Sequence, residues 1–287
     1  MLKQNKAYIY ALLAILMWST VASAFKIALS VYSPALVLLF ASATASLVLF
    51  VFYKIDNNNK PINISKLKIS LISGLFNPFI YYLILFEAYS LLPAQVAQPL
   101  NYTWPIVLTI LSSFIFKEKL RLGIWIGLIV SFIGVIIISN QDSYANSLSL
   151  LGVILAIGSS LIWSIYWIIN MKDQRPDIQK LFFNFLIGSI FILVYILVRN
   201  IPIVFSSKGI FASIYIGIFE MGISFIFWLK ALRLTSQTAK INDLVFISPF
   251  LSFFFISIIL GEKIEWSSII GLIIIVLGIS LQKTIKI

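Results

Sequence analysis

Long runs of apolar residues recur along the whole chain of 287 residues, and they limit the possible folds more than any other feature. About 20 apolar residues suffice to cross the ~30 Å hydrocarbon core of a bilayer as a helix. Counting the runs between polar breaks predicts ten such helices, at 7–29, 33–53, 68–90, 94–115, 122–139, 149–170, 181–198, 209–232, 237–259 and 266–283. With 61% hydrophobic and 11% charged residues, a soluble globular protein is excluded. We therefore expect an all-α integral membrane protein.

The Lys and Arg residues between the runs predict an orientation. If the N-terminus is cytoplasmic, most of these residues face the cytoplasm, whereas the outer loops hold only Arg199, Lys208 and Lys263. Positive loops stay inside, so we expect both termini to be cytoplasmic. The net charge of +11 then reflects orientation rather than nucleic-acid binding. A cleaved signal peptide is an alternative for the first run, but its length and the runs that follow favour a retained helix.

The two halves of the chain share a spaced pattern. Pro105, Glu118, Gly127 and Gly134 recur 144 residues later as Pro249, Glu262, Gly271 and Gly278. Each half holds five expected helices, and an odd number turns the second half over in the membrane. We predict two inverted five-helix repeats, residues 1–143 and 144–287, of the kind that secondary transporters use to expose a central site to each side in turn. A duplication that serves only packing is the alternative. Glycines seven residues apart also predict that the fifth and tenth helices pack tightly or form a dimer contact.

Three short motifs carry a family resemblance. They are Trp18-Ser19-Thr20 in the first run, Asn101-Tyr102-Thr103-Trp104-Pro105 in the fourth, and Lys117-Glu118-Lys119 before the glycine-spaced fifth run. Together with the five-plus-five helix order, they resemble the EamA branch of the drug/metabolite transporter superfamily over the whole chain. The first two motifs are similar to those of bacterial aromatic amino-acid exporters. The resemblance implies a ten-helix inner-membrane carrier whose halves share a central cavity and which exports aromatic or other hydrophobic amino acids. This chain departs from those exporters by placing Lys240 and Asp243 in the ninth run. The difference bears on the expected substrate rather than on the expected fold.

Polar and aromatic residues at helical spacing indicate where a substrate would bind. Residues at i, i+3, i+4 and i+7 share one face of a helix. The candidate binding residues are Trp18, Ser19, Asn77, Tyr81, Gln98, Asn101, Tyr102, Trp163, Tyr166 and Trp167. Unpaired amides in hydrocarbon are costly, so these faces should look inward. Helix packing or an interfacial aromatic belt would give the same spacing. Pro105 and Pro249 are expected to bend their helices and to free a backbone carbonyl.

Charged residues inside the expected spans are candidates for coupling, because charges in a bilayer are expensive. Glu220 lies near the middle of the eighth run, and Lys240 and Asp243 are three residues apart in the ninth. We expect these three to form a polar cluster along the transport path, with Glu220 as a candidate proton carrier. A structural ion pair between two helices is the alternative. Lys26 is expected to snorkel to the outer surface or to bind a carboxylate, and Glu262 to cap free N–H groups at a helix start.

Missing residue types narrow the classes of function. The chain has no Cys and no His, which removes the usual zinc, haem and thiol chemistry, and it has no phosphate-binding loop for ATP. We expect no cofactor and no metal. An intramembrane aspartyl protease needs two membrane aspartates, and only Asp243 lies in an expected span, so we do not expect an enzyme.

The leading hypothesis is a secondary carrier for small amphipathic metabolites, driven by a proton, an ion or the solute gradient. A carrier of anionic metabolites such as sugar phosphates or nucleotide sugars, or a passive channel, are the alternatives. The expected partners are a small-molecule substrate and the lipid bilayer, with no nucleic acid, and the sequence leaves monomer and homodimer open.

Overall fold

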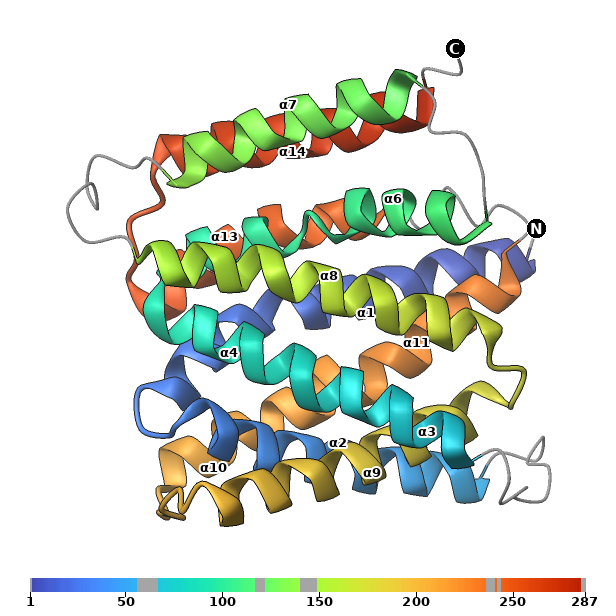
Figure 1. The fold of residues 1–287 in the computed structure, drawn as a ribbon, viewed down its shortest axis with the longest axis vertical. Coiled ribbons are helices and arrows are strands. Elements are labelled where there is room, and N and C mark those ends of the chain that lie inside the picture. Colours follow the sequence, from blue (N-terminus) through green and yellow to red (C-terminus); the bar gives the residue numbers. More distant parts are fainter. Residues whose placement is uncertain are drawn as a thin grey trace.

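The computed structural model describes residues 2–55, 67–116, 122–139, 149–235, 241 and 244–284. Within these residues every regular element is a helix, and the helices lie side by side in stacked layers (Figure 1). They are α1 (Leu2–Leu29), α2 (Pro34–Ile55), α3 (Leu67–Gly74), η2 (Leu75–Ile80), α4 (Tyr81–Leu91), α5 (Ala94–Asn101), α6 (Trp104–Phe116), α7 (Leu122–Ser139), α8 (Leu150–Lys172), α9 (Asp177–Val198), α10 (Ser207–Ile216), η4 (Gly217–Gly222), α11 (Ile223–Leu234), η5 (Leu244–Phe246), α13 (Ile247–Leu260) and α14 (Trp266–Thr284). The segments η2 and η4 are π-helical, and η5 is a 3₁₀-helix.

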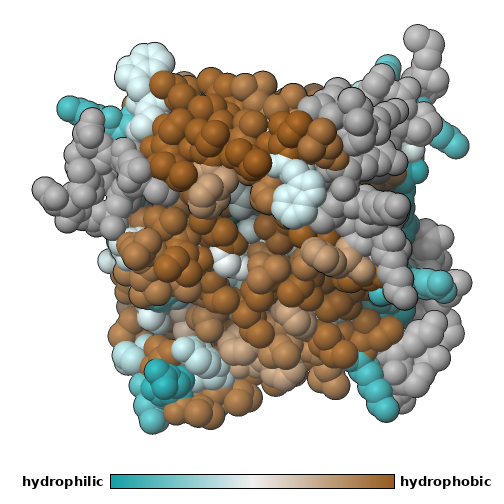
Figure 2. Space-filling view, turned by 45° about the horizontal axis from the view of Figure 1, so that its top comes forward, coloured by the Kyte–Doolittle hydropathy of each residue, from teal (hydrophilic) through white to brown (hydrophobic). Residues whose placement is uncertain are grey.

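The lengths and apolar surfaces of these helices make the chain a multi-pass membrane protein. Within the described residues, six helical stretches are long and apolar enough to cross a membrane: Lys3–Leu29, Pro34–Ile55, Leu67–Leu91, Leu150–Lys172, Asp177–Val198 and Ser207–Leu234. Shorter apolar helices cover Trp125–Ile138, Leu244–Leu260 and Trp266–Leu281. Figure 2 shows apolar residues over the middle of one face and hydrophilic residues toward the two sides where the helices end. That distribution suits a hydrocarbon layer between two polar ones.

Three runs that the sequence predicts as continuous helices are interrupted. The run 68–90 contains the π-helical η2, where Asn77 before Pro78 has a non-helical φ of −143° and ψ of 119°. The run 94–115 ends one helix at Asn101 and starts the next at Trp104. In a continuous helix the ring of Pro105 would clash with the carbonyl of Asn101, four residues earlier. The run 209–232 contains the π-helical η4, which ends at Gly222.

Helices α7 and α14 pack against each other along their length at one edge of the molecule (Figure 1). A Cβ atom on Gly134 would lie 2.6 Å from the carbonyl oxygen of Gly271, and one on Gly278 would lie 2.6 Å from the carbonyl oxygen of Gly127. Only glycine allows two backbones to approach this closely. The close packing predicted for these helices is therefore found within one chain.

A carboxylate from another part of the chain holds the start of α5. The Oε1 of Glu262 accepts a hydrogen bond from the backbone N–H of Ala94 at 3.3 Å, and its Oε2 accepts one from Gln95 at 3.5 Å. The side-chain Nε2 of Gln95 donates to the carbonyl of Lys263 at 2.7 Å. Free N–H groups at a helix start attract an anion. Glu262 thus caps α5 rather than the helix that follows it in sequence, and this fixes α5 next to the centre of the bundle.

Candidate functional site

A cavity lies inside the bundle, where α1, α4, α5, α8 and α11 approach one another. Its wall is formed by Trp18, Val21, Phe25, Tyr81, Leu85, Tyr89, Gln98, Asn101, Tyr102, Trp104, Trp163, Trp167, Glu220, Phe225, Trp228 and Val245. Most of these residues are aromatic, and Glu220 is the charged residue among them. An apolar, concave site with a few convergent polar groups is the usual form of a small-molecule site.

The structure places the sequence-predicted binding residues in two groups. Trp18, Tyr81, Gln98, Asn101, Tyr102, Trp163 and Trp167 line the cavity, together with Glu220. Ser19, Asn77 and Tyr166 are buried and do not belong to the described cavity wall. The hydroxyl of Ser19 bonds the carbonyl of Ile15 at 2.7 Å, and the hydroxyl of Tyr166 accepts from Asn170 at 3.0 Å. Binding roles for both groups stay predictions.

Other predicted residues lie away from the wall or outside the described part. Pro105 and Pro249 lie in the first turns of α6 and α13. Lys240 and Asp243 lie outside the described residues, so the predicted cluster around Glu220 stays a prediction.

The lysines Lys26 and Lys230 lie away from the cavity wall. The Nζ of Lys26 donates to the main-chain carbonyls of Tyr89 at 2.9 Å and Leu92 at 3.0 Å, at the C-terminal end of α4. A helix leaves its last carbonyls unpaired, and a cation there is favourable. Lys230 is exposed, and its Nζ lies 5.7 Å from the ring centroid of Tyr10. Neither cation belongs to the described wall of the cavity.

Aromatic rings pack against one another around the cavity in tilted and edge-to-face arrangements. The ring centroids of Trp163 and Tyr81 are 4.7 Å apart, those of Trp163 and Phe225 are 5.8 Å apart, and those of Trp18 and Trp228 are 5.3 Å apart. Pairs at 4.5–7 Å stabilise one another beyond the area they bury. The wall is therefore an aromatic cage whose ring faces and edges are available to a ligand.

Sequence reasoning missed both wall residues of α11. Phe225 and Trp228 follow Glu220 by five and eight residues. A spacing of four and eight residues places side chains on one helical face. Counting from Glu220 in this way finds neither residue, because η4 ends at Gly222 and changes the helical phase before both of them.

Glu220 is held by its neighbours on both its side chain and its backbone. The Tyr82 hydroxyl donates to Oε1 of Glu220 at 3.0 Å. The backbone carbonyl of Glu220 accepts from Nε1 of Trp18 at 3.3 Å and from the hydroxyl of Ser224 at 2.6 Å. The residue lies in η4, and such π-helical turns are frequent at functional sites. Its side chain is only partly buried, because it borders the cavity.

Gln98 presents an acceptor whose orientation is fixed by two other helices. Its Nε2 donates to the hydroxyl of Ser252 at 2.7 Å. That hydroxyl uses its only proton to bond the carbonyl of Ser19 at 2.8 Å, so it can only accept from the amide. The Oε1 of Gln98 is buried and has no hydrogen-bond partner within the described part of the chain. The cavity thus borders an unused acceptor.

Asn101 differs from Gln98 because its side-chain oxygen and nitrogen both have partners. Its Oδ1 accepts from the Tyr81 hydroxyl at 3.3 Å, and its Nδ2 donates to the hydroxyl of Ser159 at 2.8 Å. The Ser159 hydroxyl in turn donates to the carbonyl of Ala156 at 2.6 Å. This chain of bonds joins α4, α5 and α8. Asn101 therefore shapes the wall more than it offers free hydrogen-bonding groups.

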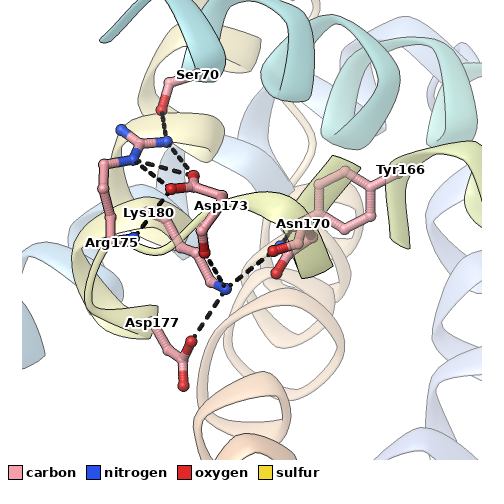
Figure 3. Close-up of polar contacts among 7 residues, drawn as sticks. All are labelled: Ser70, Tyr166, Asn170, Asp173, Arg175, Asp177 and Lys180. Atoms are coloured by element: carbon pink, nitrogen blue, oxygen red, sulfur yellow. Dashed lines mark hydrogen bonds and ion pairs between the residues drawn. The ribbon is translucent and has the colours of Figure 1, made fainter. Parts of the chain in front are cut away.

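A network of charged groups closes the turn between α8 and α9, outside the cavity (Figure 3). Arg175 forms a salt bridge with Asp173 at 2.6 Å and donates to the hydroxyl of Ser70 on α3 at 2.8 Å. Burial opposes the charge of Asp173, but the hydrogen bonds and charge of Arg175, with the charge of Lys180, outweigh it and hold the pKa of Asp173 below its ordinary value. The turn therefore depends on an ionised carboxylate.

The same network extends to α11. The Nζ of Lys180 lies 3.1 Å from Oδ1 of Asp177 and donates to the carbonyl of Asn170 at 3.2 Å (Figure 3). The other oxygen of Asp177 forms a salt bridge with Arg233 at 2.6 Å. These contacts tie α3, α8, α9 and α11 together at one end of the bundle.

Comparisons with known proteins agree on a family but leave the substrate open. The sequence matches the family model described as the EamA-like transporter family over residues 5–140 and 150–282. An uncharacterized transporter of Clostridium kluyveri is 32% identical over 174 residues, which cover 58% of this chain and 55% of the relative. The chain thus spans about half the length of that relative. The uncharacterized transporter YvbV of Bacillus subtilis is 28% identical over 222 residues, which cover 75% of this chain and 72% of YvbV. One crystal structure shares the fold at a TM-score of 0.66 and 20% identity, covering 96% of both chains.

Proposed function

Because the chain belongs to the EamA-like transporter family, we propose that it is a secondary carrier for small amphipathic metabolites, and that it exports aromatic or other hydrophobic amino acids. The observation that carries the proposal is the aromatic cavity inside the bundle, bordered by the carboxylate of Glu220. Flat rings stack on aromatic walls, and a carboxylate pairs with an amino group. An aromatic amino acid supplies both partners.

The proposed architecture has ten spans in two inverted repeats, residues 1–143 and 144–287, with both termini on the cytoplasmic side of an inner membrane. The family matches support it, because they end at residue 140 and resume at residue 150. The six long stretches also leave room for four further spans, at α5–α6, α7, η5–α13 and α14. Such repeats rock against each other to open the central cavity to either side alternately.

The cavity wall favours this substrate class over anionic metabolites. Sugar phosphates need a cation to balance their charge. Among the described residues, Lys26 is bonded to main-chain carbonyls and Lys230 is exposed beside Tyr10. A wall built largely of indole and phenol rings suits a hydrophobic substrate better.

Transport in proteoliposomes tests the proposal. Vesicles that hold the purified chain and unlabelled L-tryptophan should take up labelled L-tryptophan in a saturable way. Uptake that does not saturate would indicate a channel. Competition by sugar phosphates but not by phenylalanine would contradict the proposed substrate class.

Glu220 is proposed to couple transport to a proton, because one carboxylate cannot hold a proton and a substrate ammonium together. The variant Glu220→Gln should lose transport driven by a pH gradient, by at least about tenfold, the effect of losing one charged hydrogen bond. It should keep counterflow at a raised substrate concentration, because counterflow needs no driving ion and the lost charge lowers only the affinity for the amino group. Glu87→Gln, which removes an exposed carboxylate of α4, is the matched control. Unchanged pH-driven transport by Glu220→Gln would overturn this role.

A further inference from the structure

Two hydrogen-bond acceptors at the cavity wall, on Glu220 and Gln98, have no donor within the described part of the chain. Tyr82 donates to one carboxylate oxygen of Glu220 at 3.0 Å, and the other has no partner within the described part of the chain. The amide of Gln98 is oriented by Ser252 so that its Oε1 has no partner within the residues that the structure describes, and Gln98 is only 4% exposed. A buried acceptor without a donor is costly and indicates a missing partner. Both positions call for a ligand that donates hydrogen bonds.

The aromatic surroundings of Glu220 favour a cationic donor. Trp18 bonds the backbone carbonyl of Glu220 through Nε1 at 3.3 Å, and both residues line the cavity. Tyr82 bonds the side chain itself, and its ring centroid lies 4.6 Å from that of Tyr81, another wall residue. Ring faces attract a cation within about 6 Å. An ammonium group at Glu220 would therefore meet a carboxylate and aromatic rings together.

An anionic group would be disfavoured beside Glu220. A second carboxylate near Glu220 would be repelled, and repulsion is strong where water is scarce. The Nε1 of Trp167 is a buried donor that has no partner among the described residues, so it can bond a hydroxyl or a carbonyl of the substrate. It is neutral and does not balance the charge of a carboxylate.

We infer that the cavity recognises its substrates by a protonated amino group, bound at the carboxylate of Glu220 with Oε1 of Gln98 as a second acceptor. The inference rests on the proposed function and sharpens its substrate class. Aromatic monoamines, which carry an ammonium group and a flat ring but no carboxylate, are bound more tightly than the corresponding amino acids, and aromatic carboxylates most weakly.

Three indole compounds that differ in charge test the inference without any mutation. Tryptamine is a cation, L-tryptophan a zwitterion and indole-3-propionate an anion at neutral pH, as expected for alkyl amines and carboxylates. Binding to the purified full chain in detergent is measured by isothermal titration calorimetry. Tryptamine should bind at least about tenfold more tightly than indole-3-propionate, the difference that one charge-assisted hydrogen bond makes. Equal affinities for the three compounds would overturn the inference.

Two variants locate the recognised charge. Glu220→Gln should lose tryptamine affinity by at least about tenfold and change the affinity for indole-3-propionate little. Gln98→Leu, of similar size, should also weaken tryptamine. Glu87→Gln, which removes an exposed carboxylate of the same bundle, should leave all three affinities unchanged. Size-exclusion profiles report whether each variant is folded, and the wild-type series stands if one is not.

Transport measurements distinguish a failure of this inference from a failure of the proposed function. If tryptamine binds best but no indole compound crosses proteoliposomes, the carrier proposal fails and the inference about the cavity stands. If L-tryptophan is transported while the three compounds bind alike and Glu220→Gln binds them like the wild type, the inference fails and the carrier proposal stands.

Discussion

Asp173 and Arg175 bury almost their whole side chains at the turn between α8 and α9, with exposures of 2% and 6%. A buried ion pair adds little net stability over an apolar pair, but removing one partner leaves an uncompensated charge. The folded pKa of Asp173 lies below its unfolded value of about 3.9. The pair therefore contributes its full stability at neutral pH, and that contribution is lost as the pH falls through the folded pKa.

The variant Asp173→Asn should thus be less stable at pH 7, by about 3–5 kcal/mol, the cost of breaking a buried pair. Below about pH 4 the difference in stability between the variant and the wild type should narrow, because the wild-type carboxylate is then protonated and neutral, like the amide of the variant. Thermal unfolding of both proteins in detergent at pH 7 and pH 3 measures this difference. A difference in stability of equal size at both pH values would contradict this account. The control variant Glu87→Gln should be as stable as the wild type at both pH values.

Helical spacing alone identified much of the cavity wall, because Gln98 and Trp163 lie on faces that look inward. Spacing could not tell which amide keeps a free acceptor. Gln98 and Asn101 follow the same pattern, and each amide nitrogen donates to a serine hydroxyl of another helix. They differ because the Tyr81 hydroxyl donates to the side-chain oxygen of Asn101. Hydrogen-bond partners distant in sequence are therefore the part of a site that a local pattern does not reveal.

At the scale of whole helices, hydrophobic runs predicted the helix ends well and the interruptions poorly. Pro78 and Pro105 were visible signals of breaks in their runs, although the exact positions also depend on Asn77 and Asn101. The break at η4 has no proline. Gly217 lies against the backbone carbonyl of Ala41 on α2, so close packing rather than a breaker accompanies the change of helix geometry there.

The close contact of α7 with α14 can be tested by one methyl group. Gly134→Ala would place Cβ 2.6 Å from the carbonyl oxygen of Gly271, and backbone atoms cannot move aside cheaply. We expect Gly134→Ala to lower the free energy of unfolding by about 1–3 kcal/mol, as is typical of overpacking. Gly158→Ala in α8 is the matched control, because no atom lies within 4 Å of its added Cβ. This control variant should raise the free energy of unfolding by about 0.4–1 kcal/mol. Thermal unfolding compares the two, and equal effects would contradict the packing argument.

For the whole molecule, the absence of native cysteine makes the proposed orientation easy to test. Ser30 lies in the exposed loop after α1, and Gln174 lies in the exposed turn after α8. Under the proposed topology, Ser30→Cys in intact cells should react with a membrane-impermeant maleimide. Gln174→Cys should react only after the cells are permeabilised. The reverse labelling pattern would invert the orientation, and labelling of both in intact cells would contradict the topology.

The hydroxyl of Ser252 sets the polarity of the cavity without bordering it. It joins α1, α5 and α13 by accepting from Gln98 and donating to the carbonyl of Ser19. Without that hydroxyl, the amide of Gln98 could rotate by half a turn and show the cavity two donors in place of one acceptor. A carrier of this fold can therefore change which hydrogen-bonding groups it matches at Gln98 through a residue outside the described cavity wall. Specificity in such a family would then diverge at positions that a comparison of cavity walls overlooks.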